Sequence, residues 1–266
     1  AFQALILAFE IFVSAILFIY GWTGFTVACI SVTVIMFIRE TSLKKKNADY
    51  SGFKEKNVWI TGASSGIGEA LAKALYMAGA RVILSGRREA ELERVRSACI
   101  EQGSAARVRD VQMDLKDPLV LPLDLSRPAE MALKAEEARR LLTMLGGEGR
   151  VDVLVNNAGV SSRALAEEME WTVDQSVMAV NYLGPVALTK AVLGGMLKAG
   201  AGQIVVISSV QGLVGLPGRS AYSASKHALH GFFDSLRAEV ASRGISVTVV
   251  CPGYVRTALS LNAVTG

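Results

Sequence analysis

The chain has 266 residues, a formal net charge of +4 at pH 7, and 51% hydrophobic residues. This length suits one sizeable α/β domain plus an appendage. The modest charge and the lack of a long basic tract exclude nucleic acid as an expected partner. Three scattered cysteines without a C-x-x-C pair exclude a disulfide framework and a metal site, and they indicate a reducing compartment.

The first part of the chain is strongly apolar. Residues Ile11 to Ile38 include no Asp, Glu, Lys or Arg, and a bilayer core needs about 20 apolar helical residues. The apolar core of a signal peptide is shorter, about 7–15 residues. We therefore predict an uncleaved membrane anchor over residues 1–38. A single pass is favoured, and a two-pass hairpin broken near Gly21 and Gly24 is the alternative.

Residues 39–56 are basic and polar, which predicts a linker. Arg39 and Lys44 to Lys46 follow the apolar run, whereas Glu10 is the only charge before it. The positive-inside rule then places the rest of the chain in the cytosol, unless these cations are an ordinary solvated linker. We expect the endoplasmic reticulum membrane, with the peroxisomal membrane as the alternative.

A glycine-rich turn follows the first predicted strand of the remaining chain. The strand is Val58 to Ile60, and Gly62, Gly66 and Gly68 follow with G-x-x-x-G-x-G spacing. Such glycines permit a sharp turn, the approach of a diphosphate to backbone N–H groups, and close packing of a helix on a sheet. The helix start that follows favours an anion. The residues of this turn predicted to bind a cofactor are Gly62, Ser64, Ser65, Gly66, Ile67 and Gly68.

Short apolar strands alternate with helical stretches from residue 57 to residue 266. This alternation predicts an α/β fold with a doubly wound parallel sheet, which binds its ligand at the carboxyl edge of the strands. The predicted strands are Val58–Ile60, Arg81–Ser85, Val120–Leu123, Val153–Val155, Gln203–Ile207 and Ser246–Val250. The predicted helices are Glu69–Ala78, Pro128–Leu145, Val173–Lys198 and Ala221–Ser242.

Residues at the strand ends indicate which dinucleotide binds. Arg87 and Arg88 stand where an NAD site usually has an acidic residue, and a guanidinium matches a 2′-phosphate. The sequence therefore favours NADP(H) over NAD(H), although an exposed arginine pair is also common in loops. Asp124, followed by Leu125, can accept from an adenine amino group or cap the next helix.

Polar and small residues follow the fourth predicted strand. Asn157, Ala158 and Gly159 suit a backbone that passes close to a cofactor, although Asn-rich turns are ordinary.

Tyr222 and Lys226 carry the clearest chemistry. They are four residues apart, so on a helix they share one face. A tyrosine has a pKa near 10, and a neighbouring ammonium favours the phenolate and lowers that pKa. Ser209 ends the strand IVVISS, where its hydroxyl can donate to a carbonyl oxygen. The pattern predicts proton transfer to or from a carbonyl or alcohol oxygen.

These motifs resemble the short-chain dehydrogenase/reductase family, in the family's order, from about Lys56 to Gly266. TGASSGIG, NNAG, VNYLG, SS followed by YSASK, and CPG carry the resemblance. It implies a catalytic tetrad of Asn181, Ser209, Tyr222 and Lys226. In it Tyr222 is the acid/base, Lys226 binds the nicotinamide ribose, and Asn181 holds a water. The resemblance adds these cofactor contacts: Tyr222, Lys226, Pro252, Gly253, Val255 and Thr257.

Within the family, the likeness is to the membrane-anchored member 7 group, especially its B type. It rests on NYLGPVALTKAVL, SSVQG and GFFDSLRAEV. The group implies a lipid-like ketone such as acyl- or alkyl-dihydroxyacetone phosphate as substrate. Family members usually have a seventh strand, so six strands indicate an incomplete carboxyl end. Relatives often form homodimers through the helices at 173–198 and 221–242.

Other functions remain open from the residues alone. A retinoid or steroid dehydrogenase/reductase has the same motifs and differs in substrate. A non-catalytic NADP(H)-binding membrane protein would need no tetrad, and the intact tetrad argues against it. The direction of the reaction is not encoded in these motifs.

Overall fold

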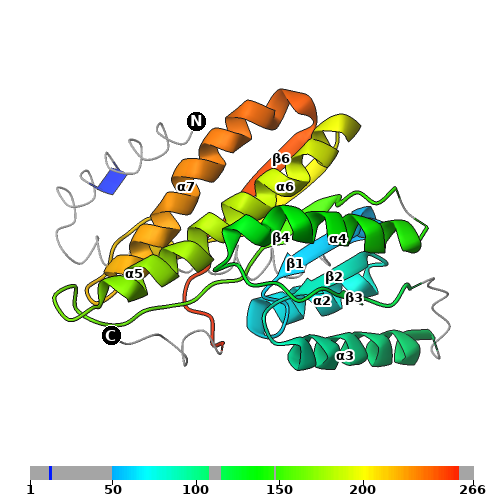
Figure 1. Ribbon diagram of the computed structural model, residues 1–266, viewed down its shortest axis with the longest axis horizontal. Helices are drawn as coiled ribbons and strands as arrows, with labels where there is room; N and C mark the ends of the chain where they lie inside the picture. The colour runs from blue at the N-terminus through cyan, green and yellow to red at the C-terminus, as the bar shows by residue number, and fades with distance from the viewer. Residues whose placement is uncertain (1–11, 14–49, 108–114, 147, 258–266) are drawn as a thin grey trace. The chain divides into compact units, whose positions relative to one another are not determined.

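The computed structural model describes residues 12–13, 50–107, 115–146 and 148–257 (Figure 1). The chain divides into two compact units, residues 1–49 and 50–266, and the second contains nearly all described residues. Apart from residues 12–13, the predicted anchor lies outside the described residues, as does most of the linker. Within the described part, one helical run, Trp171–Ala199, is long and apolar enough to cross a membrane. Its residues Leu188 and Met196 are buried in the core, so we assign it to the globular fold.

Six parallel strands form one sheet in the order β3-β2-β1-β4-β5-β6. The chain starts in the middle of the sheet, builds outward to one edge, and then crosses back to build the other edge. This is the doubly wound topology that the sequence predicted. The strands are β1 Asn57–Thr61, β2 Arg81–Ser85, β3 Leu119–Val120, β4 Val153–Asn156, β5 Gly202–Ile207 and β6 Ile245–Val250.

Helices follow the strands along the chain. The helix predicted over 173–198 is confirmed, but it is divided by a π-helical turn at Ala179–Leu183. The α-helices are α2 Gly66–Met77, α3 Glu89–Arg107, α4 Met131–Met144, α5 Trp171–Met178, α6 Gly184–Ala199 and α7 Ser220–Val240. The described 3₁₀-helices are η1 Ser51–Phe53, η2 Pro128–Glu130, η4 Val210–Gly212 and η5 Ala241–Arg243.

Two elements differ from the sequence prediction. Helix α3 was not predicted, because it is mostly polar and buries only a narrow stripe that includes Leu92, Val95 and Cys99. Strand β3 covers two residues and begins one residue before the predicted strand. The backbone beyond it still follows β2, since Leu121 N–H donates to Leu84 O and Leu123 N–H donates to Gly86 O.

Each face of the sheet has its own hydrophobic core. Trp59 lies in a cluster with residues of α4, α6 and α7, whereas Val58 and Ile60 lie in a cluster with residues of α2 and α3. This division follows from the alternation of side chains along a strand. Figure 1 shows the two groups of helices on opposite sides of the sheet. Both cores leave the carboxyl ends of the strands open for a ligand.

Candidate active site

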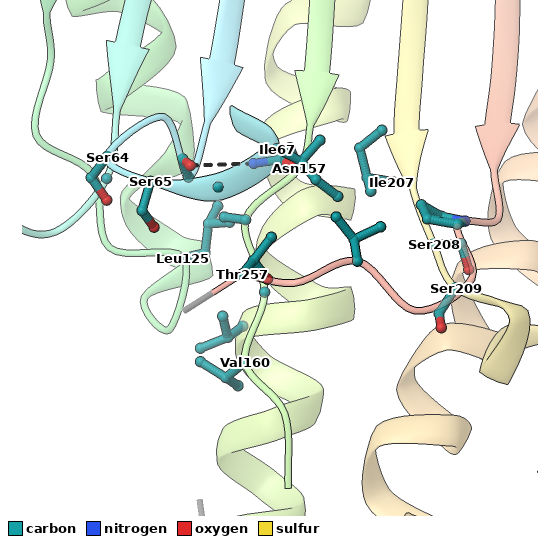
Figure 2. Close-up of a pocket in the computed structure, with 18 of the residues that line it drawn as sticks. Ser64, Ser65, Ile67, Leu125, Asn157, Val160, Ile207, Ser208, Ser209 and Thr257 are labelled. Carbon is teal, nitrogen blue, oxygen red and sulfur yellow. Dashed lines mark hydrogen bonds between the residues drawn. The ribbon is translucent and has the colours of Figure 1, made fainter. Parts of the chain in front are cut away.

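A pocket of about 430 Å³ lies at the carboxyl edge of the sheet, within the usual size range of ligand sites. Except for Gly68 and Asn181, every site residue predicted from the sequence lines this pocket. Figure 2 shows Ser64 and Ser65 at one end and Ser208 and Ser209 at the other. The structure thus gathers segments that are far apart in the sequence around one elongated cleft.

The glycine turn leaves no room for side chains. Gly62 has φ of +66°, and a Cβ there would lie 2.7 Å from the Ala158 Cα. A Cβ on Gly66, also at positive φ, would lie 3.1 Å from the Thr257 Cγ2. A Cβ on Gly68 would overlap the Gly62 carbonyl oxygen. Helix α2 therefore packs directly on the turn, which is the role predicted for Gly68 although it does not line the pocket.

The start of α2 is open to an anion. Ser65 precedes the helix in an extended conformation, and its side chain makes no capping hydrogen bond. The first N–H groups of an α-helix have no partner within the helix. Gly66 and Ile67 both line the pocket, so their N–H groups are placed to bind phosphate oxygens. The residues present fit the diphosphate of a dinucleotide.

Hydrogen bonds from Asn157 and Arg94 hold this turn in place. Asn157 Nδ2 donates to Thr61 O at 2.9 Å and to Gly62 O at 3.2 Å, the bond drawn in Figure 2. Arg94 donates to Ser64 O at 3.1 Å and pairs with Glu69. The hydrogen bond from Arg94, together with Lys73, lowers the Glu69 pKa to about 2. Partial burial acts in the opposite direction but is outweighed. Glu69 is therefore ionised at neutral pH, so its ion pair with Arg94 is kept and Arg94 stays in place to hold Ser64.

Asp124 and Arg87 lie at the next part of the pocket. Asp124 Oδ1 accepts from Ser126 N at 3.0 Å and Ser126 Oγ at 2.8 Å. Partial burial opposes ionisation, but these bonds and the positive charges of Arg87 and Arg127 hold the Asp124 pKa below its usual value. One carboxylate oxygen thus serves the local turn to Ser126, and the other is left for a ligand. Asp124 does not cap the helix that follows, because the N-cap of η2 is Arg127, with no side-chain cap.

Helix α7 brings Tyr222 and Lys226 to the pocket. Lys226 Nζ lies 5.7 Å from the centre of the Tyr222 ring. Ser209 Oγ accepts from Gln211 N–H at 3.2 Å, which leaves its hydroxyl proton available to donate. Burial raises the Tyr222 pKa, while a hydrogen bond with Ser209 and the charge of Arg219 lower it by less. The predicted lowering of the Tyr222 pKa is therefore wrong for the protein alone, because burial outweighs the favourable charges.

Lys226 is a buried cation. It is 4% exposed, and its Nζ donates to Ile207 O at 2.9 Å. Burial lowers its pKa to about 8, against a small opposing effect of Cys251. The ammonium is thus protonated at pH 7, directed at the end of β5 beside the tyrosine.

We expect the burial of Lys226 to make stability rise with pH. Below about pH 8 the lysine is charged in both the folded and the unfolded chain. Between about pH 8 and its ordinary pKa of 10.5 the folded chain releases the proton first, so the unfolded chain binds more protons and folding is favoured. Relative to Lys226→Met, the wild-type free energy of unfolding should rise by about 2–3 kcal/mol from pH 7 to pH 10. Urea denaturation of both proteins at the two pH values checks this, and parallel profiles would contradict it.

Asn181 is buried in the π-helical turn and does not face the pocket. Its Oδ1 accepts from Val160 N at 2.8 Å, and its Nδ2 donates to Val160 O at 2.9 Å and to Ser225 Oγ at 3.0 Å. The side chain therefore fixes the strand of backbone that runs from Gly159 along the pocket. The water-holding role implied by the family stays a prediction.

Several pocket residues were not predicted. Gly86 directly precedes Arg87 and Val160 directly follows Gly159, so extending each motif by one residue would have found them. Val180 comes from the middle of a predicted helix, and no local signal marks it. The unpredicted lining residues are Gly86, Leu123, Val160, Val180, Ile207 and Ser208.

The glycine turn at a helix start and the Ser209–Tyr222–Lys226 group share one cleft of a doubly wound sheet, which defines a dinucleotide-dependent oxidoreductase. The chain belongs to the short chain dehydrogenase family, whose pattern it matches over residues 56–265. It is 46% identical over 231 residues to the dehydrogenase/reductase SDR family protein 7-like of Anopheles gambiae, covering 87% of this chain and 69% of that protein. It is 49% identical over 209 residues to dehydrogenase/reductase SDR family member 7B of Xenopus tropicalis, covering 79% and 64%.

A Drosophila melanogaster relative, also called dehydrogenase/reductase SDR family protein 7-like, is 52% identical over 211 residues, which are 79% of this chain and 60% of that protein. The chain thus spans about two thirds or less of the length of these relatives. The predicted family and its member 7 group are confirmed.

Solved structures agree with this assignment. A gluconate 5-dehydrogenase from Burkholderia cenocepacia in complex with NADP and tartrate has a TM-score of 0.67 and 28% identity, covering 78% of this chain and 74% of that chain. A short chain dehydrogenase/reductase from Burkholderia phymatum in complex with NAD has a TM-score of 0.68 and 27% identity, covering 78% and 69%. Similar folds therefore bind either dinucleotide.

Proposed function

We propose that this protein is a membrane-anchored, NADPH-dependent reductase of a lipid-like ketone of the acyl- or alkyl-dihydroxyacetone phosphate type. The observation that carries the catalytic part is the convergence of Tyr222, Lys226 and Ser209 with the glycine turn in one pocket. The anchor rests on the apolar run Ile11–Ile38. The endoplasmic reticulum membrane, with the peroxisomal membrane second, follows from the same run.

The residues of the pocket support the reduction of a carbonyl. A bound reduced nicotinamide supplies the hydride. Burial raises the Tyr222 pKa, so its hydroxyl keeps the proton that it donates to the carbonyl oxygen. The Ser209 hydroxyl donates a hydrogen bond to the same oxygen, and the Lys226 ammonium stabilises the phenolate that remains.

The surface near the pocket supports an apolar substrate. The segment between Ser209 and Tyr222 has large apolar side chains in solvent, with Leu213 61% and Val214 62% exposed. Exposed apolar side chains that cluster mark binding sites for apolar groups or surfaces. This position beside Ser209 suits the chain of a lipid-like ketone whose carbonyl reaches Tyr222.

Arg87 and Arg88 support NADP(H) rather than NAD(H). Both are exposed and line the pocket beside Gly86. Within the described part of the chain, neither guanidinium forms an ion pair or a side-chain hydrogen bond, in contrast to Arg127, which pairs with Glu130 at 3.3 Å. Their hydrogen-bond donors are therefore available to a 2′-phosphate.

We expect Arg87→Ala/Arg88→Ala to weaken NADPH binding about 10- to 100-fold, the loss of one or two charge-assisted hydrogen bonds. NADH binding should change less than about threefold, because NADH lacks the 2′-phosphate. Nucleotide titration followed by tryptophan fluorescence measures both. Arg127→Ala, which removes a nearby exposed charge outside the pocket, is the matched control. An equal effect on the two nucleotides would refute NADP(H) selection by this pair.

The substrate is tested by NADPH consumption with the full-length protein in membranes. Acyl-dihydroxyacetone phosphate, retinal and a steroid ketone form the panel. Turnover of the dihydroxyacetone phosphate alone supports the proposal, whereas turnover of retinal or the steroid alone favours the retinoid or steroid alternative. Nucleotide binding without turnover of any of them would favour a non-catalytic binding protein.

A further inference from the structure

Three side chains of α7, each four residues after the last, reach three consecutive residues at the end of β5. The Tyr222 and Ser209 side chains line the same pocket, where Ser209 lowers the Tyr222 pKa. Lys226 Nζ donates to Ile207 O at 2.9 Å. His230 Nε2 lies 3.0 Å from Ser208 Oγ. The first two contacts belong to the catalytic site described above. The third has the same spacing and no role in the reaction itself.

His230 sits where the ends of β5 and β6 meet. Its Nε2 also lies 3.6 Å from the sulfur of Cys251, the residue that directly follows β6. Ser208 N–H donates to Val250 O at 2.8 Å, and Val210 N–H donates to Pro252 O at 3.1 Å. Because Ser208 is 4% exposed, its hydroxyl depends on a protein partner. Either tautomer of the ring serves, since a hydroxyl both donates and accepts.

The turn that carries Ser209 packs on the same ring. A Cβ on Gly212 would lie 2.7 Å from Ser208 Oγ and 2.9 Å from His230 Nε2, so η4 lies directly on this pair. Gln211 N–H donates to Ser209 Oγ at 3.2 Å, which couples the orientation of the serine to the same turn. A shift of His230 would therefore act on Ser209 in two ways. It would move Ser208, the neighbour of Ser209, through their hydrogen bond, and it would move η4 through the contact with Gly212.

We propose that His230 is a positioning residue for the reaction: through Ser208 it holds the turn at 208–212 so that the Ser209 hydroxyl meets the substrate oxygen beside Tyr222. The effect on turnover rests on the proposed function. The positioning of the turn does not, because it is a property of the folded chain.

The kinetic test compares His230→Ala, His230→Gln and His227→Ala. His227 lies one turn earlier on α7 and is exposed, and its Nδ1 lies 2.9 Å from Ser223 O of the same helix, so His227→Ala is the matched control.

We expect His230→Ala to lower kcat about tenfold or more, as small misplacements of reacting groups do. The nucleotide Kd should change less than about twofold. A glutamine amide can replace Nε2, so His230→Gln should recover most of kcat. Unchanged kcat, or equal loss in His227→Ala, would overturn the proposal.

Amide hydrogen exchange tests whether His230 holds the turn at 208–212, and this measurement needs no turnover. Peptides spanning residues 208–212 should exchange at least about threefold faster in His230→Ala and in Ser208→Ala than in wild type, while β1 and α2 keep their rates. If the wild-type protein turns over no carbonyl but this local change is seen, the proposed function fails and the positioning of the turn stands. Exchange that is unchanged at 208–212, or faster throughout the chain, would show that His230 does not position this turn.

Discussion

Tyr222→Phe should lower kcat by about 10²- to 10⁴-fold, the usual contribution of a positioned acid or base. The substitution removes one hydroxyl from a side chain that is 7% exposed, so the ring still fills its place in the core. The lost hydrogen bond with Ser209 should change the free energy of unfolding by only about 1 kcal/mol. Nucleotide affinity should stay within about threefold of wild type. Stopped-flow measurement of NADPH oxidation, with nucleotide titration on the same sample, checks both.

Tyr182→Phe is the control for this experiment. Tyr182 is also a partly buried tyrosine, and its ring packs edge-on against Phe232, with centroids 6.5 Å apart, away from the pocket. It should keep wild-type turnover. If Tyr222→Phe retained most of its activity, another group would have to donate the proton, and the assignment of Tyr222 would be wrong.

Gly68→Ala should destabilise the fold and weaken nucleotide binding together. The added methyl group would overlap the Gly62 carbonyl oxygen and lie 2.6 Å from Asn157 Nδ2. Relief requires α2 to move away from the turn, and overpacking of this kind costs about 1–3 kcal/mol. The higher helix propensity of alanine, up to about 1 kcal/mol, offsets part of this. We expect the free energy of unfolding to fall by about 2 kcal/mol and the nucleotide Kd to rise at least about tenfold.

Gly194→Ala separates the steric effect from helix propensity. Gly194 lies in α6, and a Cβ there would have nothing within 4 Å, so alanine should stabilise the protein by about 0.5–1 kcal/mol. Urea denaturation gives both values. A Gly68→Ala variant as stable as Gly194→Ala would contradict the close packing of α2 on the turn.

The sequence predicted the sheet and most of the pocket because their signals are local. A strand buried on both faces reads as an apolar run, and several motifs follow such a run directly, as Gly62 follows β1 and Asn157 follows β4. Parallel strands place these motifs at one edge. That geometry is sufficient to gather the glycine turn, Asn157 and Ser209 without any knowledge of side-chain contacts.

The remaining features depend on tertiary contacts that a linear pattern does not contain. Helix α3 buries only a narrow stripe, so its periodicity is weak. The direction of the Tyr222 pKa depends on burial, which the spacing of Tyr222 and Lys226 does not reveal. The contact of His230 with Ser208 joins residues 22 positions apart on two elements. The helical spacing of His230 from Lys226 can be read from the sequence. Its contact with the end of β5 cannot.

The most direct test of the central claim is a crystal structure of the protein with NADP⁺ bound. We predict the diphosphate on the N–H groups of Gly66 and Ile67, and the Tyr222 hydroxyl facing the nicotinamide with room for one carbonyl group between them. A nicotinamide on the far side of the pocket, or a Tyr222 hydroxyl separated from it by protein, would contradict proton donation by this residue.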